Sequence, residues 1–129
     1  MRDDTILIID DEPMIRHLAA RVLDRAGYRT VSAANGLQGL ACFRRERPAL
    51  VITDLIMPER EGIETILAIR RENPKVKIIA ISGGGQFGEV EVLKMAQLLG
   101  ADDVIAKPFR AEELLSRIST REPAPAAAK

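Results

Sequence analysis

The sequence contains few of the residues on which several classes of function depend. It has no tryptophan, one tyrosine and three phenylalanines, so it offers no aromatic surface on which nucleic-acid bases would stack. Its single cysteine, Cys42, excludes an internal disulfide and is typical of a reducing compartment. Because 19 basic residues balance 19 acidic ones, the net charge is zero and we expect no direct nucleic-acid partner.

Long hydrophobic runs are also absent. No apolar stretch approaches the roughly 20 residues of a membrane span, and the first residues, MRDDTILIIDDEP, lack the layout of a signal peptide. We therefore expect a cytoplasmic protein with no membrane partner. The 129 residues, of which 47% are hydrophobic and 29% charged, are typical of one folded domain.

Short β-branched runs alternate with segments of helical periodicity along the whole chain. We expect strands in TILII (5–9), YRTVSAA (28–34), ALVIT (49–53), KVKIIAIS (75–82) and DDVIAK (102–107), and helices over 13–27, 35–47, 62–73, 89–100 and 108–119. Strands that alternate with helices predict a parallel sheet with helices on both faces. The sequence therefore predicts one doubly wound α/β domain over residues 4–120, followed by a flexible Pro/Ala-rich tail or linker over 121–129.

Polar residues stand where the predicted strands end. Asp10 and Asp11 follow the first strand, Asp54 follows the third, Ser82 ends the fourth and Lys107 ends the fifth. Ligands of open α/β sheets bind outside the carboxyl ends of the strands, where the strand order reverses. If the order is 2-1-3-4-5, the first and third strands are neighbours at that point, and all five side chains converge on one pocket.

The residues of this predicted pocket suit phosphoryl transfer. Clustered carboxylates repel one another unless a cation neutralises them, and hard oxygen ligands favour Mg²⁺. A carboxylate beside the cation can act as a nucleophile toward a phosphoryl donor. The lysine, the serine hydroxyl and the backbone N–H groups of the SGGG stretch would stabilise the transferred group by charge and hydrogen bonding.

Four motifs, ILIIDDEP, VITDLIMPEREG, IIAISG and GADDVIAKPF, occur in order at these strand ends. Over residues 4–120 the sequence thereby resembles the receiver domains of two-component response regulators. The resemblance implies the flavodoxin-like five-stranded fold with strand order 2-1-3-4-5. It also implies that Asp54 is the phosphoacceptor, that Asp11, Asp54 and the backbone carbonyl of Ile56 bind Mg²⁺ directly, and that Asp10 acts through water.

The resemblance assigns roles to the last two strands and to a partner as well. Ser82 would be the switch hydroxyl that reaches the phosphoryl group, the backbone N–H of Gly83 would donate to it, and Lys107 would pair with it. A cis peptide bond is implied before Pro108. The donor would be a phosphohistidine of a sensor histidine kinase or histidine phosphotransfer protein, docking near the helix at 13–27.

The sequence departs from the receiver pattern at two places. Receivers usually carry tyrosine or phenylalanine three residues before the lysine, where this chain has Val104. Three consecutive glycines, Gly83–Gly85, follow the fourth strand, where one small residue is typical. We therefore hypothesise that rearrangement of the segment after Ser82, in place of an aromatic ring rotation, transmits the signal to an output.

Other functions and arrangements stay open at this point. A Mg²⁺-dependent phosphatase or phosphotransferase could also use Asp54 as its nucleophile, although the haloacid dehalogenase superfamily places that residue after the first strand. A flavodoxin-like FMN binder would need a phosphate loop where this chain has DDEP. We expect a signalling switch that processes no metabolite. It would be a monomer or a weak phosphorylation-dependent dimer, either stand-alone or joined to an output domain.

Overall fold

The computed structural model describes residues 5–55, 61–82, 94–95 and 97–121. Five parallel strands form one sheet in the order β2-β1-β3-β4-β5. Their bounds are β1 (Thr5–Ile9), β2 (Arg29–Ala33), β3 (Leu50–Asp54), β4 (Lys77–Ser82) and β5 (Asp103–Ala106). The predicted doubly wound fold and its strand order are therefore confirmed.

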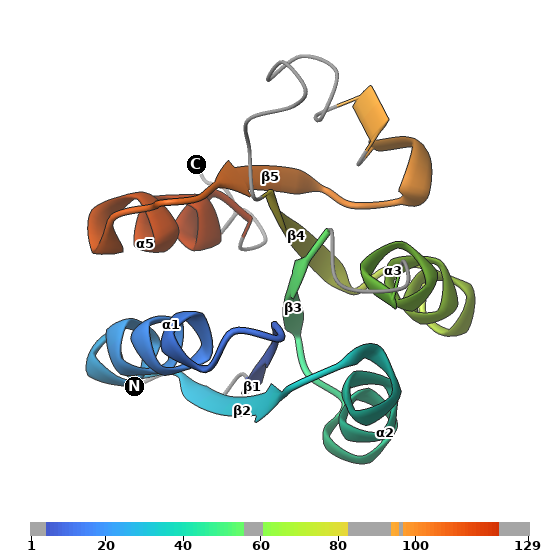
Figure 1. Ribbon diagram of the computed structural model, residues 1–129, viewed down its shortest axis with the longest axis horizontal. Coiled ribbons are helices and arrows are strands. Elements are labelled where there is room, and N and C mark those ends of the chain that lie inside the picture. The colour runs from blue at the N-terminus through green and yellow to red at the C-terminus, as the bar shows by residue number, and fades with distance from the viewer. Residues whose placement is uncertain (1–4, 56–60, 83–93, 96, 122–129) are drawn as a thin grey trace, which may run out of the picture.

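Helices cover both faces of this sheet. Their bounds are α1 (Pro13–Arg25), α2 (Gly36–Glu46), α3 (Glu61–Glu72) and α5 (Ala111–Arg121). In Figure 1, α1 and α5 lie on one face, and α2 and α3 lie on the other. Side chains that alternate along β1, β3 and β4 enter two separate apolar clusters, one beneath each helical layer. The near-continuous apolar runs of these strands are explained by this burial on both faces.

Local signals explain where several helices begin and end. The side chain of Asn35 accepts a hydrogen bond from the N–H of Gln38 at 2.8 Å and caps α2. Gly27 follows α1 with a φ of 97°, a conformation that glycine adopts without strain. The last helix was predicted from residue 108 but begins at Ala111, because Phe109 is buried in the core and ahead of the first turn.

The predicted helix over 89–100 is described only in part. Residues 94–95 and 97–99 are helical, and the remainder of its first half lies outside the described residues. The peptide bond between Lys107 and Pro108 is cis, as the resemblance to receiver domains implied. None of the described helices is long and apolar enough to cross a membrane.

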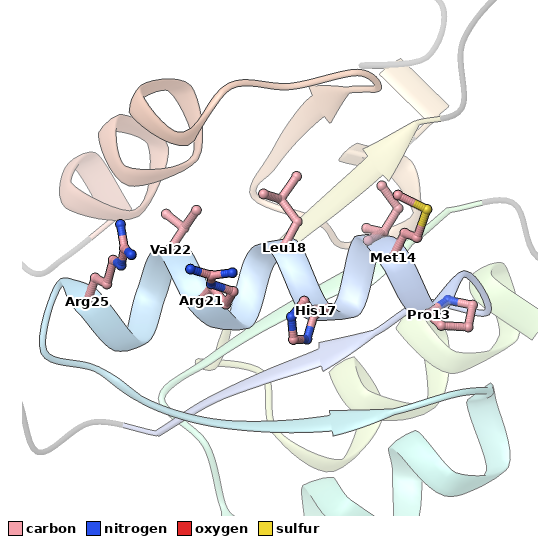
Figure 2. A pocket seen from close by; sticks show the side chains of 8 residues that line it. Pro13, Met14, His17, Leu18, Arg21, Val22 and Arg25 are labelled. Atoms are coloured by element: carbon pink, nitrogen blue, oxygen red, sulfur yellow. The ribbon is translucent and has the colours of Figure 1, made fainter.

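The outer side of α1 carries large apolar side chains that are partly or mostly exposed. Met14 is 82% exposed and Leu18 is 42% exposed, although both are large hydrophobic residues. They line a shallow hollow together with His17, Arg21 and Arg25, and Figure 2 shows these side chains along the helix. Arg21 and Arg25 therefore flank an exposed apolar stripe that starts where α1 starts.

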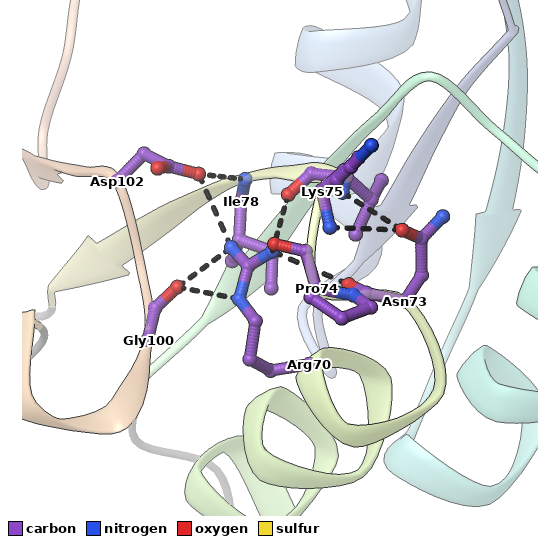
Figure 3. Close-up of polar contacts among 8 residues, drawn as sticks. Arg70, Asn73, Pro74, Lys75, Ile78, Gly100 and Asp102 are labelled. Carbon is purple, nitrogen blue, oxygen red and sulfur yellow. Dashed lines mark hydrogen bonds and ion pairs between the residues drawn. The ribbon is translucent and has the colours of Figure 1, made fainter.

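A network that we call the Arg70 clamp joins α3 to the beginnings of β4 and β5 (Figure 3). The Arg70 guanidinium donates to the carbonyl oxygen of Gly100 at 2.7 and 3.0 Å, and to that of Val76 at 2.7 Å. Asp102 Oδ2 accepts from Arg70 Nη2 at 3.2 Å and from the N–H of Ile78 at 2.9 Å. The clamp therefore joins elements at the amino-terminal ends of the strands, on the opposite side of the sheet from the predicted pocket.

Candidate functional site

The carboxyl ends of four strands bring the predicted side chains together. Asp10 directly follows β1, Asp54 and Ser82 are the last residues of β3 and β4, and Lys107 directly follows β5. The two aspartates and the serine are buried. Parallel register places Ser82 opposite Ala106, and the N–H of Lys107 donates to the Ser82 carbonyl at 2.8 Å. The strand ends therefore gather residues that are far apart in the sequence, and we call this group the pocket.

Lys107 is the cation at the centre of this pocket. Its Nζ lies 3.0 Å from Asp54 Oδ2, 3.3 Å from Asp10 Oδ2 and 2.5 Å from Glu12 Oε1. Burial lowers the pKa of Lys107, but hydrogen bonds to Glu12 and Asp54 and the charges of Asp54 and Asp10 raise it overall above its usual range. The side chain is therefore an ammonium group at any physiological pH.

Asp10 is a carboxylate whose charge is only partly compensated. Its Oδ1 accepts from the N–H of Glu12 at 2.9 Å, whereas its buried Oδ2 has no hydrogen-bond partner among the described residues. Burial raises the pKa of Asp10, the hydrogen bond from Glu12 and the nearby Lys107 ammonium lower it, and the negative charge of Asp54 raises it, so that the pKa is raised overall. The pocket thus contains a buried oxygen with capacity for a further positive partner.

The carboxylates of this pocket fit a small divalent cation. Asp10, Glu12 and Asp54 each offer an oxygen, and these oxygens lie within 4.8 Å of one another. Asp11, which the resemblance assigns to Mg²⁺, is exposed and is not part of this group. Oxygen ligands of this kind, with one buried oxygen lacking a hydrogen bond, match the preference of Mg²⁺.

Two further predicted contributors, the carbonyl of Ile56 and the N–H of Gly83, lie outside the described residues. Glu12 is a participant that was not predicted from the sequence. Glu12 does occupy the N-cap position of α1, but its side chain makes no capping hydrogen bond. Its place two residues after Asp10, at the end of the same strand, was the signal that could have revealed it.

Close packing beneath Asp54 requires glycine at one position. A Cβ added to Gly62 in α3 would lie 2.3 Å from the carbonyl oxygens of both Asp54 and Leu55. No real Cβ approaches backbone oxygens so closely, so α3 can contact the end of β3 only through a glycine. The N–H of Leu55 meanwhile donates to the Ile81 carbonyl at 2.8 Å, which continues the strand pairing past Asp54.

Val104, at the position where receivers usually carry an aromatic residue, lies in β5. It is half-buried and packs against the core cluster that contains Ile78 and Ala80. The Gly83–Gly85 stretch lies outside the described residues. The hypothesis that this segment transmits the signal in place of a ring rotation therefore stays a prediction.

The chain is similar in sequence to phosphotransfer and regulatory proteins. The response regulator receiver domain family matches it over residues 6–119. Sporulation initiation phosphotransferase F of Bacillus subtilis is 36% identical over 114 residues, which make up 88% of this chain and 90% of that protein. A probable transcriptional regulator, ycf27, of Porphyridium aerugineum is 39% identical over 120 residues, which make up 92% of this chain. The chain spans about half the length of that regulator, 48%.

Solved structures share the fold of this chain. Chemotaxis protein CheY4 of Vibrio cholerae superposes with a TM-score of 0.84 at 26% identity, covering 92% of this chain and 98% of that one. NtrX of Brucella abortus superposes with a TM-score of 0.84 at 30% identity, covering 92% of this chain but only 26% of that one. The same fold therefore occurs both by itself and as one part of a much longer chain.

Proposed function

Because the chain belongs to the response regulator receiver domain family, we propose that it accepts a phosphoryl group on Asp54 from a phosphohistidine donor. One observation carries this proposal. Lys107 Nζ contacts Asp54 Oδ2 at 3.0 Å and Asp10 Oδ2 at 3.3 Å, so one ammonium group bridges two buried carboxylates at the strand ends. This arrangement concentrates the charges that phosphoryl transfer requires around Asp54.

The proposed reaction is a single displacement at phosphorus. A carboxylate oxygen of Asp54 forms a bond to phosphorus while the bond from phosphorus to the donor imidazole nitrogen breaks, and the electron pair of that bond leaves with the imidazole. The Lys107 ammonium, already beside Asp54, compensates the charge of the transferred oxygens. We propose that the Ser82 hydroxyl and the Gly83 N–H bind the same group, as the resemblance implies.

Mg²⁺ is the proposed cofactor of this step. Asp10 and Asp54 would hold it, together with Asp11 and the Ile56 carbonyl that the resemblance adds, and it would supply further positive charge for the phosphoryl oxygens. The oxygen of Asp10 that lacks a hydrogen bond supports this assignment. Calorimetric titration of the unphosphorylated protein should show Mg²⁺ binding that Asp10→Asn weakens at least tenfold, because a buried charged ligand is lost.

Acetyl phosphate, a small phosphodonor, tests the acceptor directly. Incubation with Mg²⁺ should add the mass of one phosphoryl group to the intact protein, and hydroxylamine should remove it as expected for an acyl phosphate. Asp54→Asn should take up none, because an amide oxygen is a poor nucleophile. Asp24→Asn, which changes an exposed aspartate at the far end of α1, should be phosphorylated like the wild type. Phosphorylation of Asp54→Asn would show that the acceptor lies elsewhere.

We propose that the phosphohistidine partner docks on the outer side of α1. This helix begins at Pro13, next to Glu12 of the pocket, so a protein seated on Met14 and Leu18 would lie beside the end of the helix that adjoins the pocket. Arg21 and Arg25 would face acidic groups of such a partner (Figure 2). The apolar stripe would supply the contact area and the arginines the orientation.

A phosphohistidine protein and acetyl phosphate together separate docking from chemistry. Leu18→Ser should slow transfer from a phosphohistidine protein at least tenfold, since it removes apolar contact area from the docking surface. The same variant should react with acetyl phosphate at the wild-type rate. Leu37→Ser, which changes an exposed leucine on α2, should leave both reactions unchanged. Equal slowing by both variants would contradict docking on α1.

Phosphorylation is proposed to switch an output that is either a partner protein or a domain joined to this one. An aspartyl phosphate adds roughly two negative charges to the pocket, which would draw Lys107 and Ser82 toward Asp54 and bias an equilibrium between two arrangements of the chain. NMR spectra of the free and phosphorylated protein test this step. Shifts confined to pocket residues would contradict a propagated switch.

A further inference from the structure

Glu12 takes part in the pocket without being one of its predicted residues. It is the N-cap residue of α1, and its N–H is held by Asp10 Oδ1 at 2.9 Å. An N-cap side chain commonly accepts a hydrogen bond from the first turn of its helix, but the Glu12 side chain accepts none there. It turns instead toward the fifth strand, where Oε1 lies 2.5 Å from Lys107 Nζ.

The contact with Glu12 competes with the contact that phosphorylation needs. Lys107 Nζ is shared among Glu12, Asp54 and Asp10 in the unphosphorylated protein, and the Glu12 oxygen is the nearest of the three. Glu12 is also the member of this group whose side chain reaches solvent, with 57% of it exposed. It can therefore release the ammonium group and remain hydrated, which the buried aspartates cannot do.

We propose that Glu12 is a positioning residue that holds the Lys107 ammonium in the unphosphorylated protein and gives it up when Asp54 is phosphorylated. The inference rests on the proposed phosphorylation of Asp54 and adds a restraint on the lysine that assists it. Because the Glu12–Lys107 contact stabilises only the unphosphorylated state, it opposes phosphorylation. Removing the Glu12 charge should therefore make Lys107 more available to the transferred group.

The first test compares phosphorylation rates with acetyl phosphate at saturating Mg²⁺, followed by intact mass. Glu12→Gln should be phosphorylated about two- to fivefold faster than the wild type, the range expected when a partly exposed ion pair is lost. Glutamine keeps the length of the side chain, and the helix cap is unaffected because Glu12 does not cap through its side chain. Glu64→Gln, which removes the same charge from an exposed site on α3, should react at the wild-type rate.

A second readout does not depend on phosphorylation. In NMR spectra of the unphosphorylated protein, the Lys107 ammonium protons should exchange with water faster in Glu12→Gln than in Glu64→Gln, because a neutral amide oxygen replaces one of their three carboxylate acceptors and holds the ammonium group less strongly. Glu12→Asp keeps the charge on a side chain one methylene shorter and should restore part of the protection. A residue with a merely structural role at the start of α1 would leave this exchange unchanged.

The outcomes separate this inference from the proposed function. Slower phosphorylation of Glu12→Gln, combined with weaker Mg²⁺ binding by calorimetry, would overturn the inference and identify Glu12 as a cation ligand. Unchanged phosphorylation with unchanged Lys107 exchange would overturn it as well. Failure of the wild type itself to gain a phosphoryl group on Asp54 would contradict the proposed function, whereas the exchange experiment would still decide whether Glu12 holds Lys107.

Discussion

A cation and its acceptors lie at each of the two ends of the parallel strands, but the two cations differ in how completely their acceptors are satisfied. At the amino-terminal edge, Arg70 faces one carboxylate, Asp102, and several backbone carbonyl oxygens, with every contact at hydrogen-bond distance. At the carboxyl edge, Lys107 is shared by three carboxylates, and Asp10 Oδ2 has no hydrogen-bond partner among the described residues. The clamp is a satisfied network that stabilises the fold, whereas the incompletely satisfied carboxylates at the other end of the strands are where we propose that a ligand binds.

The two cations suit these different tasks. A guanidinium presents five donors in a fixed planar fork, so Arg70 can bind the carbonyls of Gly100, Pro74 and Val76 at once. An ammonium group is a compact charge on a flexible stem, and it can move among several oxygens with little change in geometry. The amino-terminal ends of the strands, where the contacts stabilise the fold, therefore carry an arginine. The carboxyl ends, where we propose that the charge changes, carry a lysine.

The largest expected effect comes from removing the clamp. Arg70→Met should lower the free energy of unfolding by about 3 kcal/mol, because several partly buried carbonyls lose their donor. Urea denaturation measures this loss. Arg71→Met, at the exposed neighbouring position, serves as the matched control and should have little effect. Equal destabilisation by the two variants would mean that the clamp contributes nothing beyond a general loss of positive charge.

The aspartate of the clamp should also stabilise the fold, to a smaller extent. Asp102→Asn should lower the free energy of unfolding by about 1–2 kcal/mol, since Asp102 Oδ2 accepts from both Arg70 and the N–H of Ile78. Acetyl phosphate should label this variant at the wild-type rate, because the clamp lies at the far edge of the sheet. Urea denaturation and intact mass together check both statements.

The matched substitution in the pocket should change the free energy of unfolding in the opposite direction. Asp10→Asn should raise the free energy of unfolding by about 1 kcal/mol in the absence of Mg²⁺, because the desolvation of this buried charge and its repulsion by Asp54 outweigh its ion pair with Lys107. The same urea experiment measures it beside Asp102→Asn. If both substitutions destabilised the protein, the pocket would be as satisfied as the clamp and the contrast would be wrong.

The gain from Asp10→Asn should depend on pH. Burial raises the pKa of Asp10 in the folded state above its value in the unfolded chain, so the ionised carboxylate destabilises the fold at neutral pH. The penalty is relieved as the pH falls through the raised folded-state pKa, where Asp10 takes up a proton. The stability difference between the variant and the wild type should therefore be constant near pH 7 and shrink toward acidic pH. A difference independent of pH would exclude ionised Asp10 as its cause.

Much of the fold follows from local patterns. Some features depend only on consecutive residues and can be predicted without the structure: the apolar runs of β1, β3 and β4, and the cap at Asn35. Boundaries were less predictable where tertiary packing decides them. The helix α5 was predicted to start at residue 108 but starts at Ala111, because Phe109 is buried in the core. No local sequence signal indicates that burial.

The sequence by itself determined that acids, a serine and a lysine stand at the ends of four of the five strands, because strand ends are set locally and parallel strands end on the same side of the sheet. Only the tertiary structure decided which of these groups touch. The contact of Glu12 with Lys107 spans 95 residues, and that of Arg70 with Gly100 spans 30. Such contacts depend on how side chains from separate elements share a small volume, and the spacing of residues along the chain does not encode that geometry.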